Sequence, residues 1–310
     1  MTTALITHPA CLEHEPGPYH PESPPRLSAV LAALEAPAFA DLLREQAPEA
    51  SVEQLRRVHP ANYVDAILAI RPDFGEGVQL DPDTVMSAGS ADAALRAAGA
   101  AVKGVDAVME GWARSVFAAV RPPGHHAEPA RPMGFCLFNN VAVAALHARA
   151  RWGVQRVAVV DFDVHHGNGT QAMFEQDADL FYASSHQSPC YPGTGDAAEH
   201  GVANNVVNAP LRPGDGSSSF RAAWENEILP ALDRFAPGLL IISAGFDAHR
   251  ADPLAQIRLE TADFAWITDE LVRLADRHCG GRVVSVLEGG YDLDALAAST
   301  AAHVRGLMRI

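Results

Sequence analysis

The chain has 310 residues, of which 48% are hydrophobic, and its mean hydropathy is −0.01. This composition is typical of a globular enzyme and excludes a largely disordered chain, and no apolar run reaches the roughly 18 to 20 residues that a membrane span requires. With 23 Lys and Arg against 38 Asp and Glu, the formal net charge is −15, which argues against direct binding to nucleic acid or to an anionic membrane surface.

The cysteines and the general layout of the sequence indicate one reduced domain. Four cysteines lie far apart without a CxxC pair, and the opening MTTALITHPA lacks the features of a signal peptide. We therefore expect a cytoplasmic protein. No repeat, low-complexity tract or long polar linker divides the sequence, so we expect a single catalytic domain over residues 1–310.

Six short apolar runs predict strands, and they lie at 3–7, 115–120, 156–160, 180–184, 238–243 and 282–287. Stretches rich in Ala and Leu predict helices before three of these strands, at 91–111, 138–153 and 218–238. Strands that are apolar throughout, joined by helices, predict an α/β fold with a parallel sheet covered on both faces. Three loops rich in Pro and Gly, at 14–25, 121–134 and 188–216, lie near strand ends, where such sheets bind ligands.

The run RVAVVDFDVHHGNGTQ, residues 156–171, places side chains that can bind metal directly after a predicted strand. Asp163 and His165 are separated by one residue, so on an extended segment they point the same way and can offer an oxygen and a nitrogen ligand to one ion. Asp247, which follows another strand in SAGFDAHRADPL, is the candidate third ligand. An isolated pair of this kind could instead cap a helix, but polar side chains after four other strands favour a metal site.

Two further segments supply groups for acid-base chemistry at the same edge of the sheet. His125 and His126 follow a Pro-Pro-Gly turn; they cannot easily share one ion, but they can act as hydrogen-bonding or acid-base groups on one substrate. Tyr291 follows Glu-Gly-Gly, and its phenol could donate a hydrogen bond to a developing oxyanion. Each residue alone could be an ordinary loop residue; beside a predicted metal, they indicate hydrolysis.

Taken together, the segments RPPGHHAEPARPMGFCLFNNVAVAA, VDFDVHHGNGTQ, SAGFDAHRADPL and LEGGYDL resemble the zinc-dependent histone deacetylase family. The resemblance is to the class II-like branch, which includes bacterial deacetylases and acetylpolyamine amidohydrolases, and HPACLEHEPGPYHPESPPRLSAV extends it over nearly the whole chain. It implies the arginase/deacetylase fold, an eight-stranded parallel sheet between helices with the site at the C-terminal strand ends. It also implies hydrolysis of an N-acetylated amine to acetate and free amine.

The same resemblance implies roles for individual residues. One zinc ion per chain would be bound by Asp163, His165 and Asp247. His126 would be the general base, His125 would be its partner, and Tyr291 would polarise the acetyl carbonyl. Asp161 would pair with the first histidine and Asn168 with the second. Another branch of the family has Asp at this last position. In this chain the neutral amide of Asn168 leaves the second histidine without a carboxylate partner, which should keep that histidine readier to act as a base.

Ion and substrate positions also follow from the resemblance. A potassium ion close to the zinc would be held by the Asp161 side chain, the carbonyls of Asp163, His165 and Ser185, and Ser184. Carbonyls near Phe174, Asp177 and Leu180 would form a second monovalent site, unless they make ordinary loop hydrogen bonds. The walls of a narrow acyl-lysine tunnel would be Gly134, Phe135, Tyr191 and Leu254, with Tyr191 standing where Phe is usual. Arg26 matches an arginine near an acetate exit, although it could be a surface ion-pair partner.

Three alternatives concern the reaction and its substrate. An arginase-like ureohydrolase with two manganese ions would need an aspartate two positions after Asp247, where His249 stands. A catalytically inactive acyl-lysine binding module would need a broken site. The partner could be an acetylated lysine peptide or an acetylated small amine such as an acetylpolyamine. Residues 71–90 are too few for the extra loop of acetylpolyamine hydrolases, which favours a broad lysine deacetylase. In this segment, Asp81 and Asp83 could bind a peptide backbone or cap a turn. No oligomeric state is predicted.

Overall fold

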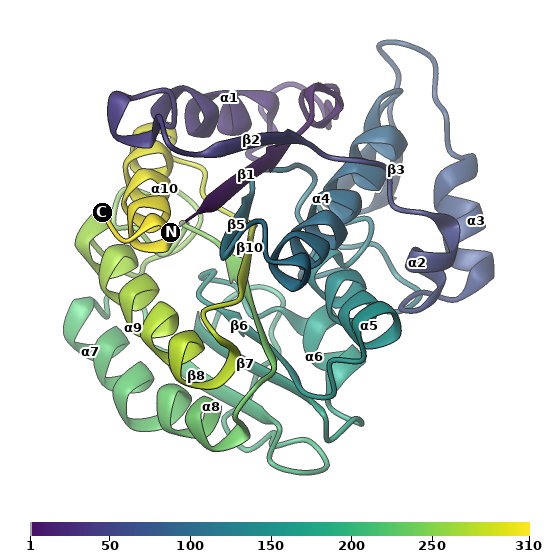
Figure 1. The fold of residues 1–310 in the computed structure, drawn as a ribbon. Coiled ribbons are helices and arrows are strands. Elements are labelled where there is room, and N and C mark those ends of the chain that lie inside the picture. Colours follow the sequence, from purple (N-terminus) through teal and green to yellow (C-terminus); the bar gives the residue numbers. More distant parts are fainter. Residues whose placement is uncertain (1) are drawn as a thin grey trace.

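Within residues 2–310, which the structure, a computed structural model, describes, eight parallel strands form one central sheet (Figure 1). The strands are β1 (Thr3–Thr7), β2 (Leu43–Gln46), β5 (Ser115–Ala118), β6 (Val157–Asp161), β7 (Leu180–Gln187), β8 (Val206–Leu211), β9 (Leu239–Ala244) and β10 (Val283–Leu287). Their order across the sheet is β2-β1-β5-β10-β9-β6-β7-β8, and every neighbouring pair is parallel.

The inner strands form because their side chains are apolar on both faces. β6 and β9 are buried at every position and consist mainly of Val, Leu, Ile and Ala, the composition of parallel strands covered on both sides. The six predicted strands are confirmed, with ends shifted by up to three residues. The predicted α/β fold with its eight-stranded parallel sheet is therefore confirmed.

The two edge strands, β2 and β8, are missing from the sequence-based prediction. β2 reads LREQ and is exposed at every position, so it carries no apolar signal. β8 contains Asn208 and Pro210, and proline is tolerated in a sheet mainly at an edge, where its missing N–H costs no hydrogen bond. The prediction of a loop over 188–216 is wrong for residues 206–211 for this reason.

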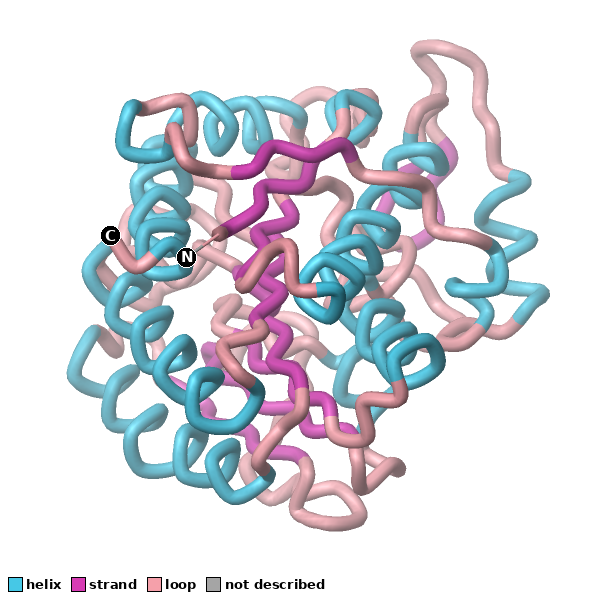
Figure 2. Tube along the Cα trace, viewed as in Figure 1, coloured by secondary structure: helices cyan, strands magenta, loops and turns pink. Residues whose placement is uncertain are grey.

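Helices cover both faces of the sheet, and the strands run between them in Figure 2. One face is covered by α4 (Ser90–Glu110), α5 (Asn140–Trp152) and α6 (Asn168–Phe174). The other face is covered by α7 (Ser217–Ala223), the π-helical turn η3 (Trp224–Ile228), α8 (Leu229–Phe235), α9 (Thr261–Cys279) and α10 (Leu293–Met308), and α1 (Pro24–Ala33) packs on α10. All three predicted helical stretches are confirmed, the last as the consecutive elements α7, η3 and α8.

The remaining elements lie outside these layers. They are the short helices η1 (Pro9–Leu12), η2 (Pro37–Phe39), α2 (Val52–Arg56) and α3 (Ala61–Ala69) and the antiparallel hairpin of β3 (Val78–Asp81) and β4 (Thr84–Met86). No helix within residues 2–310 is long and apolar enough to cross a membrane. Because all eight central strands run the same way, their carboxyl ends meet at one edge, and the loops after β5, β6, β7, β9 and β10 converge there.

Candidate active site

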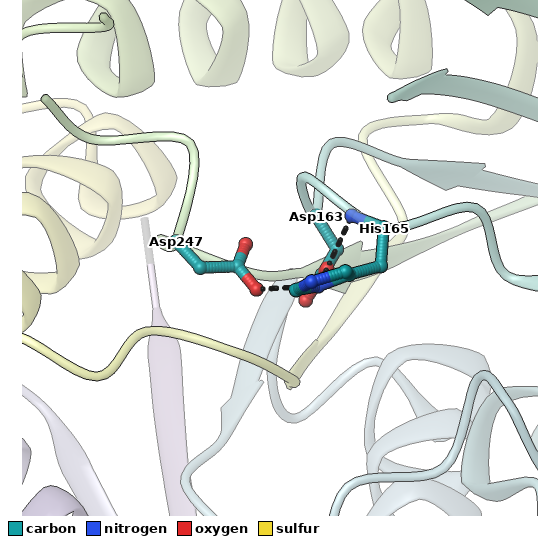
Figure 3. Close-up of side chains that lie close together, drawn as sticks. All are labelled: Asp163, His165 and Asp247. Atoms are coloured by element: carbon teal, nitrogen blue, oxygen red, sulfur yellow. Dashed lines mark hydrogen bonds and ion pairs between the residues drawn. The ribbon is translucent and has the colours of Figure 1, made fainter. Parts of the chain in front are cut away.

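Three buried side chains converge at the carboxyl edge of the sheet, as Figure 3 shows. Asp163 and His165 come from the loop after β6, and Asp247 comes from the loop after β9. Nδ1 of His165 lies 3.1 Å from Oδ1 of Asp163 and 3.1 Å from Oδ2 of Asp247. One candidate ligand atom from each residue lies within 4.8 Å of the other two, so the three side chains fit around a single ion.

Backbone N–H groups from two strand ends hold the two carboxylates in place. The N–H of Gly289 donates to Oδ2 of Asp163 at 2.8 Å, and the N–H of Val164 donates to Oδ1 of Asp247 at 2.8 Å. A Cβ on Gly289 would lie 2.2 Å from Oδ2 of Asp247, and a Cβ on Gly245 would lie 2.0 Å from Oδ2 of Asp163. Only glycine can approach the carboxylates this closely, so both positions depend on the missing side chain.

The charges of this group favour a cation. Burial and the neighbouring Asp163 raise the pKa of Asp247 to about 7, because two carboxylates deprived of water repel each other. Burial opposes the charged form of His165, yet its hydrogen bonds to both aspartates raise its pKa well above the usual value. A divalent ion bound to all three residues would neutralise the two carboxylates directly. Within residues 2–310 this is the one group of three or more His, Cys, Asp or Glu side chains so arranged, and it gives no support to a two-metal site.

The tandem histidines lie beside this group and have different partners. Nδ1 of His125 lies 2.9 Å from Oδ2 of Asp161, which also accepts a hydrogen bond from the Tyr182 hydroxyl. Nδ1 of His126 lies 2.8 Å from Oδ1 of Asn168. The expected pairings of Asp161 and Asn168 with the two histidines are therefore found in the structure.

The amide of Asn168 is itself hydrogen-bonded to a carboxylate. Its Nδ2 donates to Oε1 of Glu128 at 2.8 Å, so the second histidine reaches a carboxylate through one intervening amide. The direct partner of His126 is thus the amide, as expected, and the carboxylate of Glu128 contacts that amide and not the histidine. Glu128 follows His126 by two residues in GHHAEP, and that closeness was the signal available in the sequence.

The two histidines differ in charge. Burial opposes the charged form of His125, but Asp161, Asp163 and Glu288 outweigh it and raise the pKa of His125 to about 10. Burial and the positive neighbours His125 and His165 lower the pKa of His126 well below the usual value. The surroundings therefore favour the charged form of His125 and the neutral form of His126.

Sequence reasoning missed a further buried carboxylate, Glu288, which directly follows β10. Its Oε2 accepts hydrogen bonds from the backbone N–H groups of Gly124 at 2.7 Å and His125 at 3.2 Å. Burial raises the pKa of Glu288 to about 7. Through these hydrogen bonds Glu288 links the loop after β10 to the loop that carries the histidines. Its only signal in the sequence was an acidic residue at the end of an apolar strand, in LEGGY.

Tyr291 and Arg26 contact each other near the end of β10. The backbone N–H of Tyr291 donates to Oδ2 of Asp252 at 2.7 Å, and the guanidinium carbon of Arg26 lies 4.8 Å from the centre of the Tyr291 ring. Arg26 is fully buried, pairs with Glu22 at 3.0 Å and donates to the carbonyls of Glu288 and Gly290, which excludes the surface ion pair considered for it. Burial raises the pKa of Tyr291 well above its usual value, so the phenol keeps its proton.

A cavity of about 330 Å³ leads to these groups. It is lined by Asp83, His126, Gly134, Phe135, His165, Cys190, Tyr191, Leu254 and Tyr291. The four predicted wall residues are all among them, together with one candidate metal ligand, one of the tandem histidines and Tyr291. The cavity walls are mainly apolar, with a few polar groups from Asp83, His126, His165 and Tyr291, as in pockets that bind small or extended ligands.

The residues expected to bind potassium make hydrogen bonds within the protein. Ser184 faces Asp161 in the register of β6 and β7, and its hydroxyl lies 2.9 Å from Nδ1 of His186; the Ser185 hydroxyl accepts from Nε1 of Trp224 at 3.0 Å. At the expected second site, Nδ2 of Asn205 donates at 2.9, 3.0 and 2.8 Å to the carbonyls of Phe174, Asp177 and Leu180. These are the loop hydrogen bonds considered as the alternative there, and potassium binding at either place stays a prediction.

Comparisons with known proteins agree with this geometry. The sequence pattern of the histone deacetylase domain matches residues 20–307. An uncharacterized protein of Synechocystis is 43% identical over 309 residues, covering 98% of this chain and 99% of the relative, and the histone deacetylase-like amidohydrolase of Pseudomonas aeruginosa is 40% identical over 311 residues, covering 93% and 81%. The crystal structure of the HDA15 HD domain matches with a TM-score of 0.93 and 38% identity, over 99% of this chain and 88% of that one.

Proposed function

The chain belongs to the histone deacetylase family of hydrolases, and we propose that it is a zinc-dependent deacetylase acting on acetyl-lysine side chains of proteins or peptides. The observation that carries the proposal is the apolar cavity of about 330 Å³ that ends at the Asp163–His165–Asp247 group. Its mainly apolar lining suits the methylenes of a lysine side chain, and the polar groups of His126, His165 and Tyr291 in that lining suit an amide.

The chemistry of the three candidate ligands fits zinc. Two carboxylates and one imidazole form an open three-ligand set of the kind that catalytic zinc sites use. When bound there, zinc would act as a Lewis acid on the amide carbonyl and lower the pKa of a bound water towards about 7. The residues around the ligands then have to hold the substrate, take up one proton and deliver one.

We assign the uptake of the proton to His126. It is the neutral histidine of the pair, and its ring lines the cavity, so Nε2 can accept a proton from the attacking water. His125, kept charged by Asp161, would stabilise the negative charge that develops beside it. The leaving amine would take its proton from this pair.

We assign the second contact to the carbonyl oxygen to Tyr291. Tyr291 lines the same cavity as His126, and its phenol stays protonated, so it can donate a hydrogen bond to the oxygen as charge develops there. Asp252 and Arg26 would fix its position through its backbone N–H and its ring. With the tandem histidines and Tyr291 all present, a binding module without activity has little support.

Acetylated polyamines are the alternative substrates, because the net charge of −15 and Asp83 at the cavity would attract a polycation. Residues 71–90 form the short β3–β4 hairpin and leave little chain for an additional loop over the entrance. This favours an extended peptide, which needs an open rim.

Two finer expectations complete the proposal. We expect potassium near Asp161 and Ser184, which an assay in potassium against a bulky organic cation would test. All four cysteines are free, as in proteins of reducing compartments, so we expect a cytoplasmic location.

The deciding experiment compares kcat/KM of the zinc-loaded protein on acetyl-lysine peptides with that on acetylated putrescine, spermidine and spermine. A hydroxamate inhibitor and a chelated sample that is reloaded with zinc or manganese serve as controls. A peptide preference of at least 10-fold supports the proposal, and a polyamine preference of that size replaces it with the alternative. No activity on either substrate class, with zinc bound, would contradict both.

A further inference from the structure

A row of three side chains runs outward from the cavity, and its outer member has no role in the proposal above. Nδ1 of His126 lies 2.8 Å from Oδ1 of Asn168, and Nδ2 of Asn168 donates to Oε1 of Glu128 at 2.8 Å. His126 and Asn168 are buried, and Glu128 is half-buried at the end of the row. Asn168 begins α6, so the row joins the loop after β5 to this helix.

The direction of the hydrogen bonds in this row is fixed from its outer end. An ionised carboxylate only accepts hydrogen bonds, so Asn168 must turn its NH2 group towards Glu128. The sulfur of Met133 lies 3.3 Å from the same Nδ2, and a thioether is also only an acceptor. The NH2 group therefore has two acceptors on one side, and the carbonyl oxygen of Asn168 must face His126.

The orientation of the amide in turn decides the tautomer of His126. The amide oxygen only accepts, so Nδ1 of His126 must carry the hydrogen. In a neutral imidazole the other nitrogen, Nε2, then holds the lone pair. A general base at this position needs its lone pair on the nitrogen that faces the reacting water.

We infer that Glu128 is a positioning residue, which sets the working tautomer of His126 through the amide of Asn168. An aspartate next to a histidine fixes the tautomer unaided, whereas an asparagine can present either its oxygen or its NH2 group. An asparagine at this position therefore needs a neighbour that only accepts; Glu128 supplies the strong acceptor, and the Met133 thioether is only a weak one. The kinetic consequences of this inference rest on the proposed function. The hydrogen-bond geometry is independent of it.

The backbone of Glu128 has a separate structural task, which makes the side chain testable alone. Its N–H and C=O pair with the C=O and N–H of Arg131 in a short antiparallel bridge. Replacing the carboxylate by an amide keeps this bridge and the shape of the side chain. In the unrelated Ser-His-Asp triad of serine proteases, loss of the correct histidine tautomer lowers kcat by about 10⁴-fold. A partly populated wrong tautomer of His126 should cost less, about 10- to 100-fold.

The test exchanges the two groups of the row. Glu128→Gln should lower kcat about 10- to 100-fold with KM within threefold, because neither amide is then fixed. Asn168→Asp should also lower kcat, because two carboxylates would face each other at hydrogen-bond distance. The double variant Glu128→Gln/Asn168→Asp should recover kcat to within about fivefold of the wild type, because the new carboxylate accepts from His126 and the new amide donates to it. Glu225→Gln, at an exposed glutamate of η3, is the matched control for loss of charge.

A second readout separates this inference from the proposed function. Nitrogen-15 NMR of the zinc-loaded protein, with His126→Ala used for assignment, should show neutral His126 with its hydrogen on Nδ1 in the wild type and in the double variant. In Glu128→Gln it should show a mixture of the Nδ1–H and Nε2–H tautomers. This pattern supports the inference even if no acetylated substrate is turned over. An active enzyme with the Glu128→Gln kcat within threefold of wild type, or a double variant no better than the single ones, would overturn it.

Discussion

A single methyl group at Gly289 should disrupt the candidate metal site. Its Cβ would lie 2.2 Å from Oδ2 of Asp247 and 2.6 Å from Oδ2 of Asp163, whereas nonbonded heavy atoms pack at about 3.5 Å. Each carboxylate would have to retreat by roughly 1 Å, and zinc sites tolerate displacements of only about 0.2 Å. We therefore expect Gly289→Ala to weaken zinc binding by at least about 100-fold and to lower activity at limiting zinc in parallel.

The assay is competition for zinc against a chelator of known affinity, followed by kcat measured at several zinc concentrations. Gly245→Ala, whose Cβ would lie 2.0 Å from Oδ2 of Asp163, should behave alike from a different strand end. Gly238→Ala is the control, because its Cβ would meet only a Val154 methyl at 3.1 Å and a carbonyl at 3.5 Å. Circular dichroism of the metal-free proteins shows whether each variant folds. A folded Gly289→Ala protein with zinc affinity within threefold of wild type would refute the reasoning.

Three further outcomes are expected. Tyr291→Phe should lower kcat about 10²- to 10³-fold and leave hydroxamate affinity within a few-fold, and an unchanged kcat would contradict the role of the phenol. Glu288→Gln, which replaces the acceptor of two backbone N–H groups with an amide, should lower kcat about 10-fold in steady-state assays; full activity would show that the buried carboxylate does not hold the histidine loop. Burial lowers the pKa of the core residue His303 to about 3, so the stability it contributes is present above pH 6.5 and is lost as pH falls, by about 1.4 kcal/mol per pH unit. Urea unfolding at pH 7, 6 and 5 should show that the free energy of unfolding falls less steeply with decreasing pH in His303→Gln than in the wild type. A stability difference between variant and wild type that is the same at all three pH values would contradict this role of His303.

Much of the site could be predicted because its residues are adjacent in sequence and follow apolar strands. Asp163 and His165 are two residues apart, and Asp247 follows a strand whose apolar run is plain. Parallel strands bring such segments to one edge, so spacing and topology together were sufficient.

The rest depends on contacts between distant segments that leave no periodic signal. Asn168 and Glu128 are 40 residues apart, and their hydrogen bond exists only because α6 packs beside the loop after β5. The role of Arg26 was ambiguous because burial of a charged side chain cannot be inferred from its neighbours in sequence. Its partner Glu22 is four residues away, but Glu22 also pairs with Arg121, which is 99 residues further along the chain than Glu22. The edge strands β2 and β8 lack the apolar composition that reveals buried strands.

The position of β10 has a consequence for how the enzyme is made. It is the latest of the eight strands in the sequence, yet it lies in the middle of the sheet, between β5 and β9. Until it emerges from the ribosome, the β2-β1-β5 group and the β9-β6-β7-β8 group have no strand to join them. The tandem histidines belong to the first group and the three candidate zinc ligands to the second. A nascent chain could therefore gather its metal-binding side chains well before it could hydrolyse anything, and catalytic competence would arrive only with the final strand.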